Sequence, residues 1–175
     1  MQCCAVVLLT HWTAAAPAQP AGGAVEMVVS AMGLLGVPYK LGGDDPSAGL
    51  DCSGLVRFVA RGALGMALPR QAEAISRAGT EVDRQNLRPG DLVFFNTLGK
   101  PFSHVGVFLG DERFIHAPAR SGRVRMEQMS QPYWRARFDG ARRLGLPAGE
   151  ERAGPPALDP LGPSWADVPQ GRIEP

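Results

Sequence analysis

The spacing of apolar residues changes along the chain, and this change limits the folds open to it. Between residues 24 and 77, apolar residues recur at helical spacing, and glycine or proline marks the segment ends. From residue 88 onward, short runs rich in valine and phenylalanine alternate with tight glycine turns. Helices first and antiparallel strands afterwards predict an α+β domain rather than a chain of βαβ units.

The same pattern places the individual elements. Helices are expected over residues 24–35, 53–63 and 71–77, and residues 44–49 are expected to form a loop. The first helix carries a set of apolar residues expected to share its buried side: Val25, Val28, Val29, Met32 and Leu35. Strands are expected within residues 88–96, 104–110, 113–119, 123–129 and 137–144.

Composition and charge narrow the class of protein. The chain has 175 residues, of which 45% are hydrophobic and 20% charged, which is typical of a globular domain. Its formal net charge of +1 gives no overall field for binding nucleic acid. No apolar stretch is long enough to span a membrane, so no membrane span is expected.

Both ends of the chain differ from its middle. Residues 1–23 combine a short apolar run with alanine-rich sites typical of signal-peptidase cleavage, which favours a secretory leader; a plain disordered leader is the alternative. Residues 147–175 are rich in proline and glycine and show no apolar period, which predicts a disordered tail. The folded domain is therefore expected over residues 24–146.

Cys52 is the only cysteine outside the extreme N-terminus. A lone cysteine is either a small buried hydrophobic residue or a working thiol. Cys52 lies where the helix over residues 53–63 should begin, and unpaired backbone N–H groups at a helix start lower the pKa of a thiol. Its position therefore favours a nucleophile.

Two histidines, His104 and His116, fall on neighbouring predicted strands joined by a tight turn. An imidazole near Cys52 can accept the thiol proton, and a second polar group can orient that imidazole. We therefore expect His104 to be the base and His116 to orient it. Zinc binding by the same three residues is an alternative, but no pair of them has the short spacing typical of zinc ligands.

Four segments together are similar to a known family. "DCSGLVRFV", "PGDLVFF", "SHVGVFLG" and "RFIHA" occur in this order, and the chain resembles the NlpC family of cell-wall cysteine peptidases over residues 24–144. The resemblance implies a papain-like α+β fold, in which helices with the nucleophile at a helix start pack on an antiparallel β-sheet. It implies Cys52 as nucleophile, His104 as general base and acid, and His116 as the third polar residue.

The resemblance also implies substrate-binding residues. Asp51 and Ser53 correspond to residues that hold the free amine of the substrate's N-terminal L-alanine. Tyr39 corresponds to a tyrosine that helps polarise the scissile carbonyl, and Arg70 to an arginine near the cleft. Ser103, directly before the histidine, is expected to line the same site. Helix capping by Asp51 and core packing of Tyr39 are the structural alternatives.

The expected substrate is the peptide stem of bacterial peptidoglycan, cut at the γ-D-glutamyl bond to the diamino acid, in the periplasm or cell envelope after export. A thiol amidase or acyltransferase is the first alternative, and a non-enzymatic wall-binding or metal-binding module is the second. No cofactor or metal is expected. One departure from the family concerns substrate preference: after "LPR", many relatives have a hydroxyl residue and a glutamine, where this chain has Gln71-Ala72-Glu73-Ala74.

Overall fold

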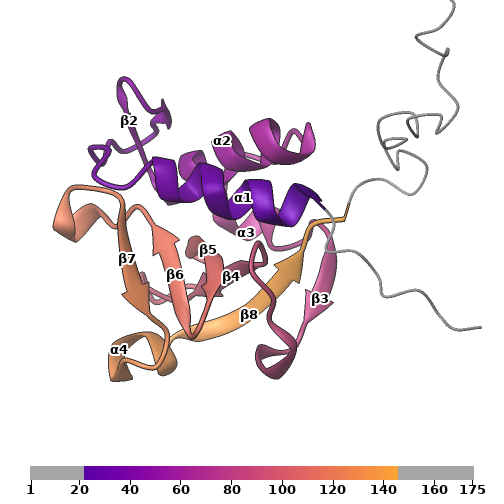
Figure 1. Ribbon diagram of the computed structural model, residues 1–175. Helices are drawn as coiled ribbons and strands as arrows, with labels where there is room; N and C mark the ends of the chain where they lie inside the picture. Colours follow the sequence, from indigo (N-terminus) through magenta and orange to yellow (C-terminus); the bar gives the residue numbers. More distant parts are fainter. Residues whose placement is uncertain (1–21, 146–175) are drawn as a thin grey trace, which may run out of the picture.

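One six-stranded antiparallel sheet forms the lower layer of the molecule (Figure 1). The computed structural model describes residues 22–145. The strand order is β3-β8-β4-β5-β6-β7, so β8, the last strand along the chain, lies between β3 and β4. The strands are β3 (Thr80–Val82), β4 (Leu92–Phe95), β5 (His104–Gly110), β6 (Arg113–His116), β7 (Arg125–Gln128) and β8 (Phe138–Arg143).

Two longer helices lie side by side over one face of this sheet, and a short helix lies at its other side (Figure 1). They are α1 (Gly22–Gly33) and α2 (Cys52–Leu64), with α4 (Pro132–Arg135) opposite. A short helix α3 (Ala72–Ile75) follows α2, and single 3₁₀ turns cover Arg84–Asn86 and Ala119–Ser121. The predicted α+β class is confirmed.

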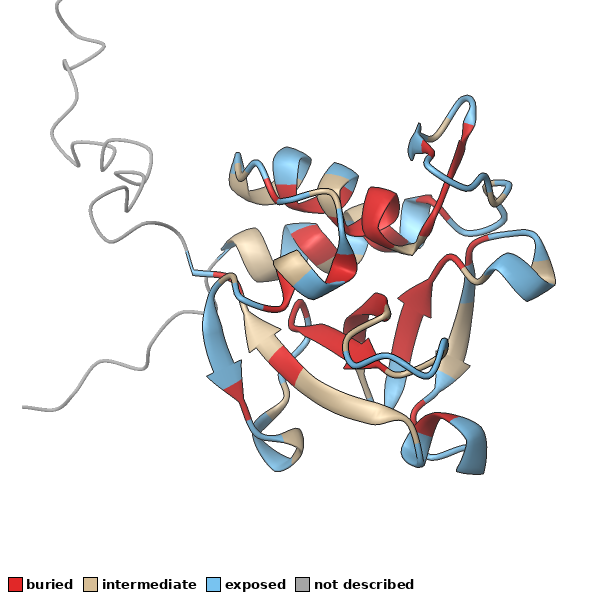
Figure 2. Cartoon of the chain, turned by 180° about the vertical axis from the view of Figure 1, so that it is seen from behind, coloured by how far each residue is buried: buried red, intermediate tan, exposed pale blue. Residues whose placement is uncertain are grey.

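The central strands of the sheet are buried on both faces, and this produces two hydrophobic cores (Figure 2). Strand β4 shows why, because all four of its residues are apolar and fully buried. Leu92 and Phe94 pack into the core beneath α1 and α2, whereas Val93 and Phe95 pack into the core beside α4. An unbroken apolar run is what a strand covered on both faces requires.

The prediction for the buried side of α1 is wrong. Met27 and Ala31 are the buried residues of this helix, and Leu34 follows them on the same side. Val25 and Val29, which were expected to be buried, are 55% and 58% exposed. The helix is apolar around most of its circumference, so its sequence pattern does not identify which stripe faces the core.

Helix α2 begins at Cys52, one residue earlier than expected, and both of its ends are capped. The Asp51 side chain accepts a hydrogen bond from the Gly54 backbone N–H, as an N-cap residue does. At the other end Gly65 adopts φ 65° and its N–H bonds to carbonyls of the last turn. The two caps fix the helix over Cys52–Leu64.

The structure contains elements that the pattern did not predict. Residues expected to form a loop include a small hairpin of β1 (Asp44–Asp45) and β2 (Gly49–Leu50). Strand β3 and helix α4 were also missed, and α3 is shorter than expected. Residues 1–21 and 146–175, which hold most of the predicted leader and the predicted tail, lie outside the described residues.

The first prediction concerns Gly54, where α2 touches the chain before the β1–β2 hairpin. A Cβ at this position would lie 1.9 Å from the Gly43 carbonyl oxygen. Gly54→Ala should therefore lower the free energy of unfolding by about 1–3 kcal/mol or prevent folding. Gly62→Ala, on the same helix with nothing within 4 Å of its Cβ, is the control and should be neutral or stabilising by up to about 1 kcal/mol. Denaturant unfolding of both variants measures the difference, and equal stabilities would contradict the proposed contact.

Candidate active site

Cys52 is the first residue of α2 and lies against the first core, partly exposed. Burial, and then the negative charge of Asp51, raise the pKa of its thiol to about 11. Backbone hydrogen bonds at Val105, Ser53 and Cys52 itself lower the pKa of the thiol without offsetting these effects. The helix start was expected to lower this pKa, but burial and the charge of Asp51 outweigh it, so Cys52 is a neutral thiol at pH 7.

The hydrogen bond at Val105 also places the Cys52 sulfur beside the start of β5, where His104 is the first residue. His116 is the last residue of β6. Both imidazoles are buried, and Nε2 of His104 lies 2.7 Å from Nδ1 of His116. The structure thus brings the two imidazoles into contact and places the thiol beside Val105, the residue that follows His104.

The register of β5 and β6 makes the two histidines diagonal neighbours, because His116 lies opposite Gly106, two residues after His104. Val107 pairs with Ile115, and the register shifts between Phe108 and Gly110. A glycine is required at position 106 between the rings, because a Cβ there would lie 2.6 Å from the Ile115 carbonyl oxygen. This close approach of backbone lets the imidazoles meet.

Both histidines are neutral at pH 7. Burial lowers the pKa of His104 to about 4, although the charge of Asp51 acts in the opposite direction. Burial, followed by the neighbouring charges of His104 and Arg125, lowers the pKa of His116 well below its usual range. Cys52 and both imidazoles are therefore uncharged at pH 7.

Trp134 packs against both imidazoles and was not identified from the sequence. Its ring stacks on His104 with centroids 5.8 Å apart and meets His116 edge-on at 4.9 Å. Its indole N–H donates to the carboxylate of Glu127, which lies on β7. Neither residue could be recognised from the sequence as part of the site, because Trp134 falls in a helix that was not predicted and Glu127 resembles an ordinary solvent-facing strand residue.

The Asp51 carboxylate is buried and accepts hydrogen bonds from three segments of the chain. Its Oδ1 accepts from Gly54 N–H, from the Ser53 hydroxyl and from Arg70, and its Oδ2 accepts from Gly42 N–H and again from Arg70. Burial alone would raise the pKa of Asp51, but these bonds outweigh it and hold the pKa below its usual range. Asp51 is therefore ionised, and Arg70 is fixed beside it.

The remaining predicted residues lie around Cys52. Burial, and the charges of Cys52 and Asp51, raise the pKa of Tyr39, so that its hydroxyl keeps its proton at neutral pH. The hydroxyl of Ser103 accepts bonds from the backbone N–H groups of Thr97 and Leu98 and so holds the loop that forms one wall of the site.

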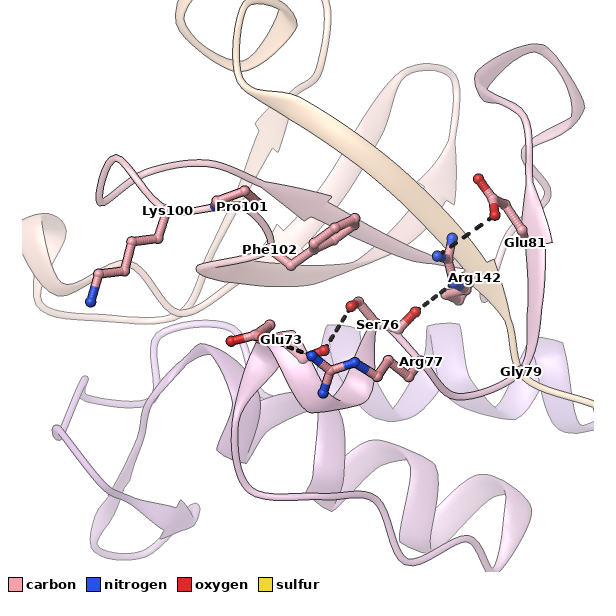
Figure 3. A pocket seen from close by; sticks show the side chains of 9 residues that line it. All are labelled: Glu73, Ser76, Arg77, Gly79, Glu81, Lys100, Pro101, Phe102 and Arg142. Carbon is pink, nitrogen blue, oxygen red and sulfur yellow. Dashed lines mark hydrogen bonds and ion pairs between the residues drawn. The ribbon is translucent and has the colours of Figure 1, made fainter.

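A groove of about 530 Å³ exposes this site to solvent. Cys52, Arg70 and Ser103 line it, together with residues of α3 and of the loop over residues 98–103. A second hollow of about 700 Å³ shares Glu73, Lys100, Pro101 and Phe102 with it. Figure 3 shows this hollow between the short helix, the loop and Arg142 of β8. The two hollows are therefore neighbours along α3 and the loop over residues 98–103.

Within residues 22–145, no three His, Cys, Asp or Glu side chains are grouped in a way that could hold a metal ion. The same part of the chain contains no helix of the length and hydropathy needed to cross a membrane.

The second prediction follows from the buried imidazoles. The pKa of His104 is 6.5 in an unfolded chain and about 4 in the folded one, which corresponds to about 3 kcal/mol of stability above pH 6.5. This stability is lost as pH falls from 6.5 through 4, because the unfolded chain then binds a proton that the folded one does not. Urea unfolding between pH 7 and 4 should therefore show that the free energy of unfolding falls more steeply with decreasing pH for the wild type than for His104→Gln. Parallel curves would contradict the depressed pKa of His104.

Comparison with known proteins agrees with this geometry. The chain is 46% identical over 128 residues to the gamma-DL-glutamyl hydrolase of Bacillus subtilis, an alignment that covers 73% of this chain and 31% of the relative. It is 43% identical over 109 residues to the murein DD-endopeptidase MepS/murein LD-carboxypeptidase of Escherichia coli, covering 62% of this chain and 56% of the relative. The chain thus spans about a third to about half of these two relatives.

Solved structures give the same result. An NlpC/P60 family protein from Bacillus cereus superposes with a TM-score of 0.66 at 32% identity, over 73% of this chain and 42% of that one. The NlpC/p60 domain of the peptidoglycan hydrolase SagA superposes with a TM-score of 0.60 at 32% identity, over 69% of this chain and 98% of that domain. The model of the NlpC/P60 family matches residues 36–143, which include Cys52 and both buried histidines. The resemblance in the sequence is confirmed, and the chain belongs to the NlpC/P60 family.

Proposed function

We propose that this protein is a cysteine peptidase that hydrolyses the peptide stems of bacterial peptidoglycan through Cys52, His104 and His116. The observation that carries the proposal is the buried hydrogen bond between His104 and His116, together with a thiol that lies at a helix start beside Val105, the residue after His104. Burying two imidazoles side by side disfavours their protonated forms, so a core gains little from such a pair. The pair is useful in a reaction in which one ring must accept a proton and then return it.

In the proposed reaction, the neutral thiol loses its proton only as it attacks. His104 uses Nε2 toward His116, so Nδ1 is the nitrogen left to accept the thiol proton. Sγ of Cys52 forms a bond to the substrate carbonyl carbon, and backbone N–H groups at the start of α2 stabilise the resulting oxyanion. His104 then donates its proton to the leaving amine, and water hydrolyses the thioester.

Residues around the thiol supply substrate contacts in this proposal. Tyr39 keeps its proton and can donate to the oxyanion. Asp51 and Ser53 would face the free amine of the stem, with Arg70 sharing the same carboxylate. Because Asp51 already accepts bonds from three segments, we propose that the ammonium adds to this network rather than replacing it. Ser103 shapes the wall of the groove.

We propose cleavage of the γ-D-glutamyl bond to the diamino acid, which is supported by the name of the Bacillus relative. A second candidate is the D,D cross-link between stems, since the Escherichia relatives are named murein DD-endopeptidases. Both bonds lie in peptidoglycan outside the cytoplasm. We therefore propose that the protein acts in the bacterial envelope after export.

The third prediction tests the three catalytic residues. Wild type incubated with a mixed pool of stem peptides and cross-linked muropeptides should give new products by mass spectrometry, and their masses identify the bond. Cys52→Ala should give no products. The rate of His104→Ala should fall at least about 10²-fold, which is the contribution of general acid–base catalysis. His116→Asn should keep partial activity because an amide oxygen can still accept from His104. Identical products from wild type and Cys52→Ala would overturn the proposal, and the binding-module alternative would then replace it.

The fourth prediction tests recognition of the free amine. Acetylating the N-terminal amine of a stem removes the positive charge that would face Asp51, so kcat/KM should fall about tenfold, which equals about 1.4 kcal/mol. The matched substrate is the same stem with its amine free. An unchanged rate would show that Asp51 only caps α2 and fixes Arg70, and it would leave the peptidase proposal standing.

A further inference from the structure

One ring nitrogen of the imidazole pair has no hydrogen-bond partner. Nε2 of His116 is buried and unpartnered within the described part of the chain, and the residue is 0% exposed. The charged atom that faces it is Oε1 of Glu127, 4.0 Å away. Unpartnered buried polar atoms are uncommon in folded proteins, so this one needs an explanation.

The positions of the ring hydrogens determine whether Nε2 of His116 is protonated. A neutral imidazole has one N–H and one acceptor nitrogen. If Nδ1 of His104 is to accept a proton, its hydrogen must sit on Nε2 and point at Nδ1 of His116. His116 then carries its own hydrogen on Nε2. The unpartnered atom is therefore a donor, and it faces a carboxylate.

The Glu127 carboxylate is held in place by its neighbours. The Trp134 indole N–H donates to Oε2 at 2.9 Å, and Nε of Arg125 lies 3.0 Å from Oε1. Glu127 and Arg125 lie on β7, which pairs with β6 so that Arg125 is opposite His116. The Glu127 side chain is 16% exposed, and the tryptophan that holds it also stacks on His104.

We propose that Glu127 is a positioning residue of this site: its carboxylate holds His116 in the tautomer with hydrogen on Nε2 and stabilises the positive charge that forms when His104 accepts the thiol proton. In that step the thiol proton moves to Nδ1 of His104 and the electron pair stays on sulfur. The imidazolium is hydrogen-bonded to His116, whose far side faces Glu127. The catalytic part of this inference rests on the proposed peptidase function.

The other charged groups near the pair set the sign of the effect. Asp51 acts on His104 from the start of α2, and Arg125 acts on His116 from β7. With Glu127 neutralised, Arg125 remains as an unopposed positive charge opposite His116. The pair should then become harder to protonate, and Arg125→Gln should have the opposite effect.

The experiment compares Glu127→Gln, which keeps an acceptor for Trp134 but removes the charge, with Glu112→Gln as a matched control on an exposed turn. For Glu127→Gln, kcat/KM on the plateau should fall roughly tenfold, part of the 10²–10⁴-fold that acid–base catalysis supplies. The acidic limb of its pH profile should move to lower pH, and that of Arg125→Gln to higher pH. Glu127→Asp should restore part of the rate. Glu112→Gln should match the wild type in kcat/KM and in the position of the acidic limb.

A second readout needs no substrate, so it separates this inference from the peptidase proposal. The chain has three histidines, and nitrogen-15 NMR of the full chain reports the tautomer of each ring. His116 should carry hydrogen on Nε2 in the wild type and titrate at lower pH in Glu127→Gln. An unchanged tautomer and titration would overturn the role of Glu127, and so would an unshifted acidic limb in a folded, active variant. If Glu127→Gln does not fold, Arg125→Gln decides: His116 should then titrate at higher pH than in the wild type, and an unchanged titration would overturn the inference.

Discussion

The geometry of the site depends on the buried carboxylate of Asp51. It accepts hydrogen bonds from the loop before β1 through Gly42, from the first turn of α2, and from Arg70 ahead of α3. Three segments that are distant in sequence therefore meet at one charge. Because Cys52 directly follows Asp51, these bonds also fix the position of the proposed nucleophile. The same charge lies next to the thiol and opposes its ionisation, so the interaction that positions Cys52 also keeps it protonated.

A neutral resting site has consequences for the chemistry. The thiolate is the reactive form of cysteine, and burial holds both Cys52 and His104 uncharged at neutral pH. In the proposed reaction, proton transfer between them creates two charges in a poorly solvated place. The transfer becomes favourable when Sγ gives its electron pair to the substrate carbonyl and backbone N–H groups stabilise the oxyanion. A thiol that stays protonated is also less readily alkylated or oxidised than a thiolate.

The sequence predicted the parts of the fold where pattern and burial agree. Strands β4 to β6 were found because their apolar runs are bounded by turns, and β7 because its residues alternate in the manner of a strand. Cys52 and the two histidines were singled out because so few residues of these types occur. The buried side of α1 was missed because that helix is apolar on several sides. Strand β3 was missed because two of its three residues are exposed. The raised pKa of Cys52 and the contact of Glu127 with His116 depend on tertiary packing, which no local pattern encodes.

The site also links the two layers of the molecule. Cys52 packs against the core between α1, α2 and the sheet, whereas both imidazoles pack against Trp134 and the aromatic side chains of the core on the opposite face. The thiol and His104 therefore pack on different cores, and Cys52 reaches the sheet at Val105, the residue that follows His104. The packing of α2 on the sheet thus sets where the thiol lies relative to β5. Because hydrogen-bond distances tolerate only a few tenths of an ångström, the proposed proton transfer depends on the docking of α2 through Gly54 and Asp51 as well as on the proposed catalytic side chains.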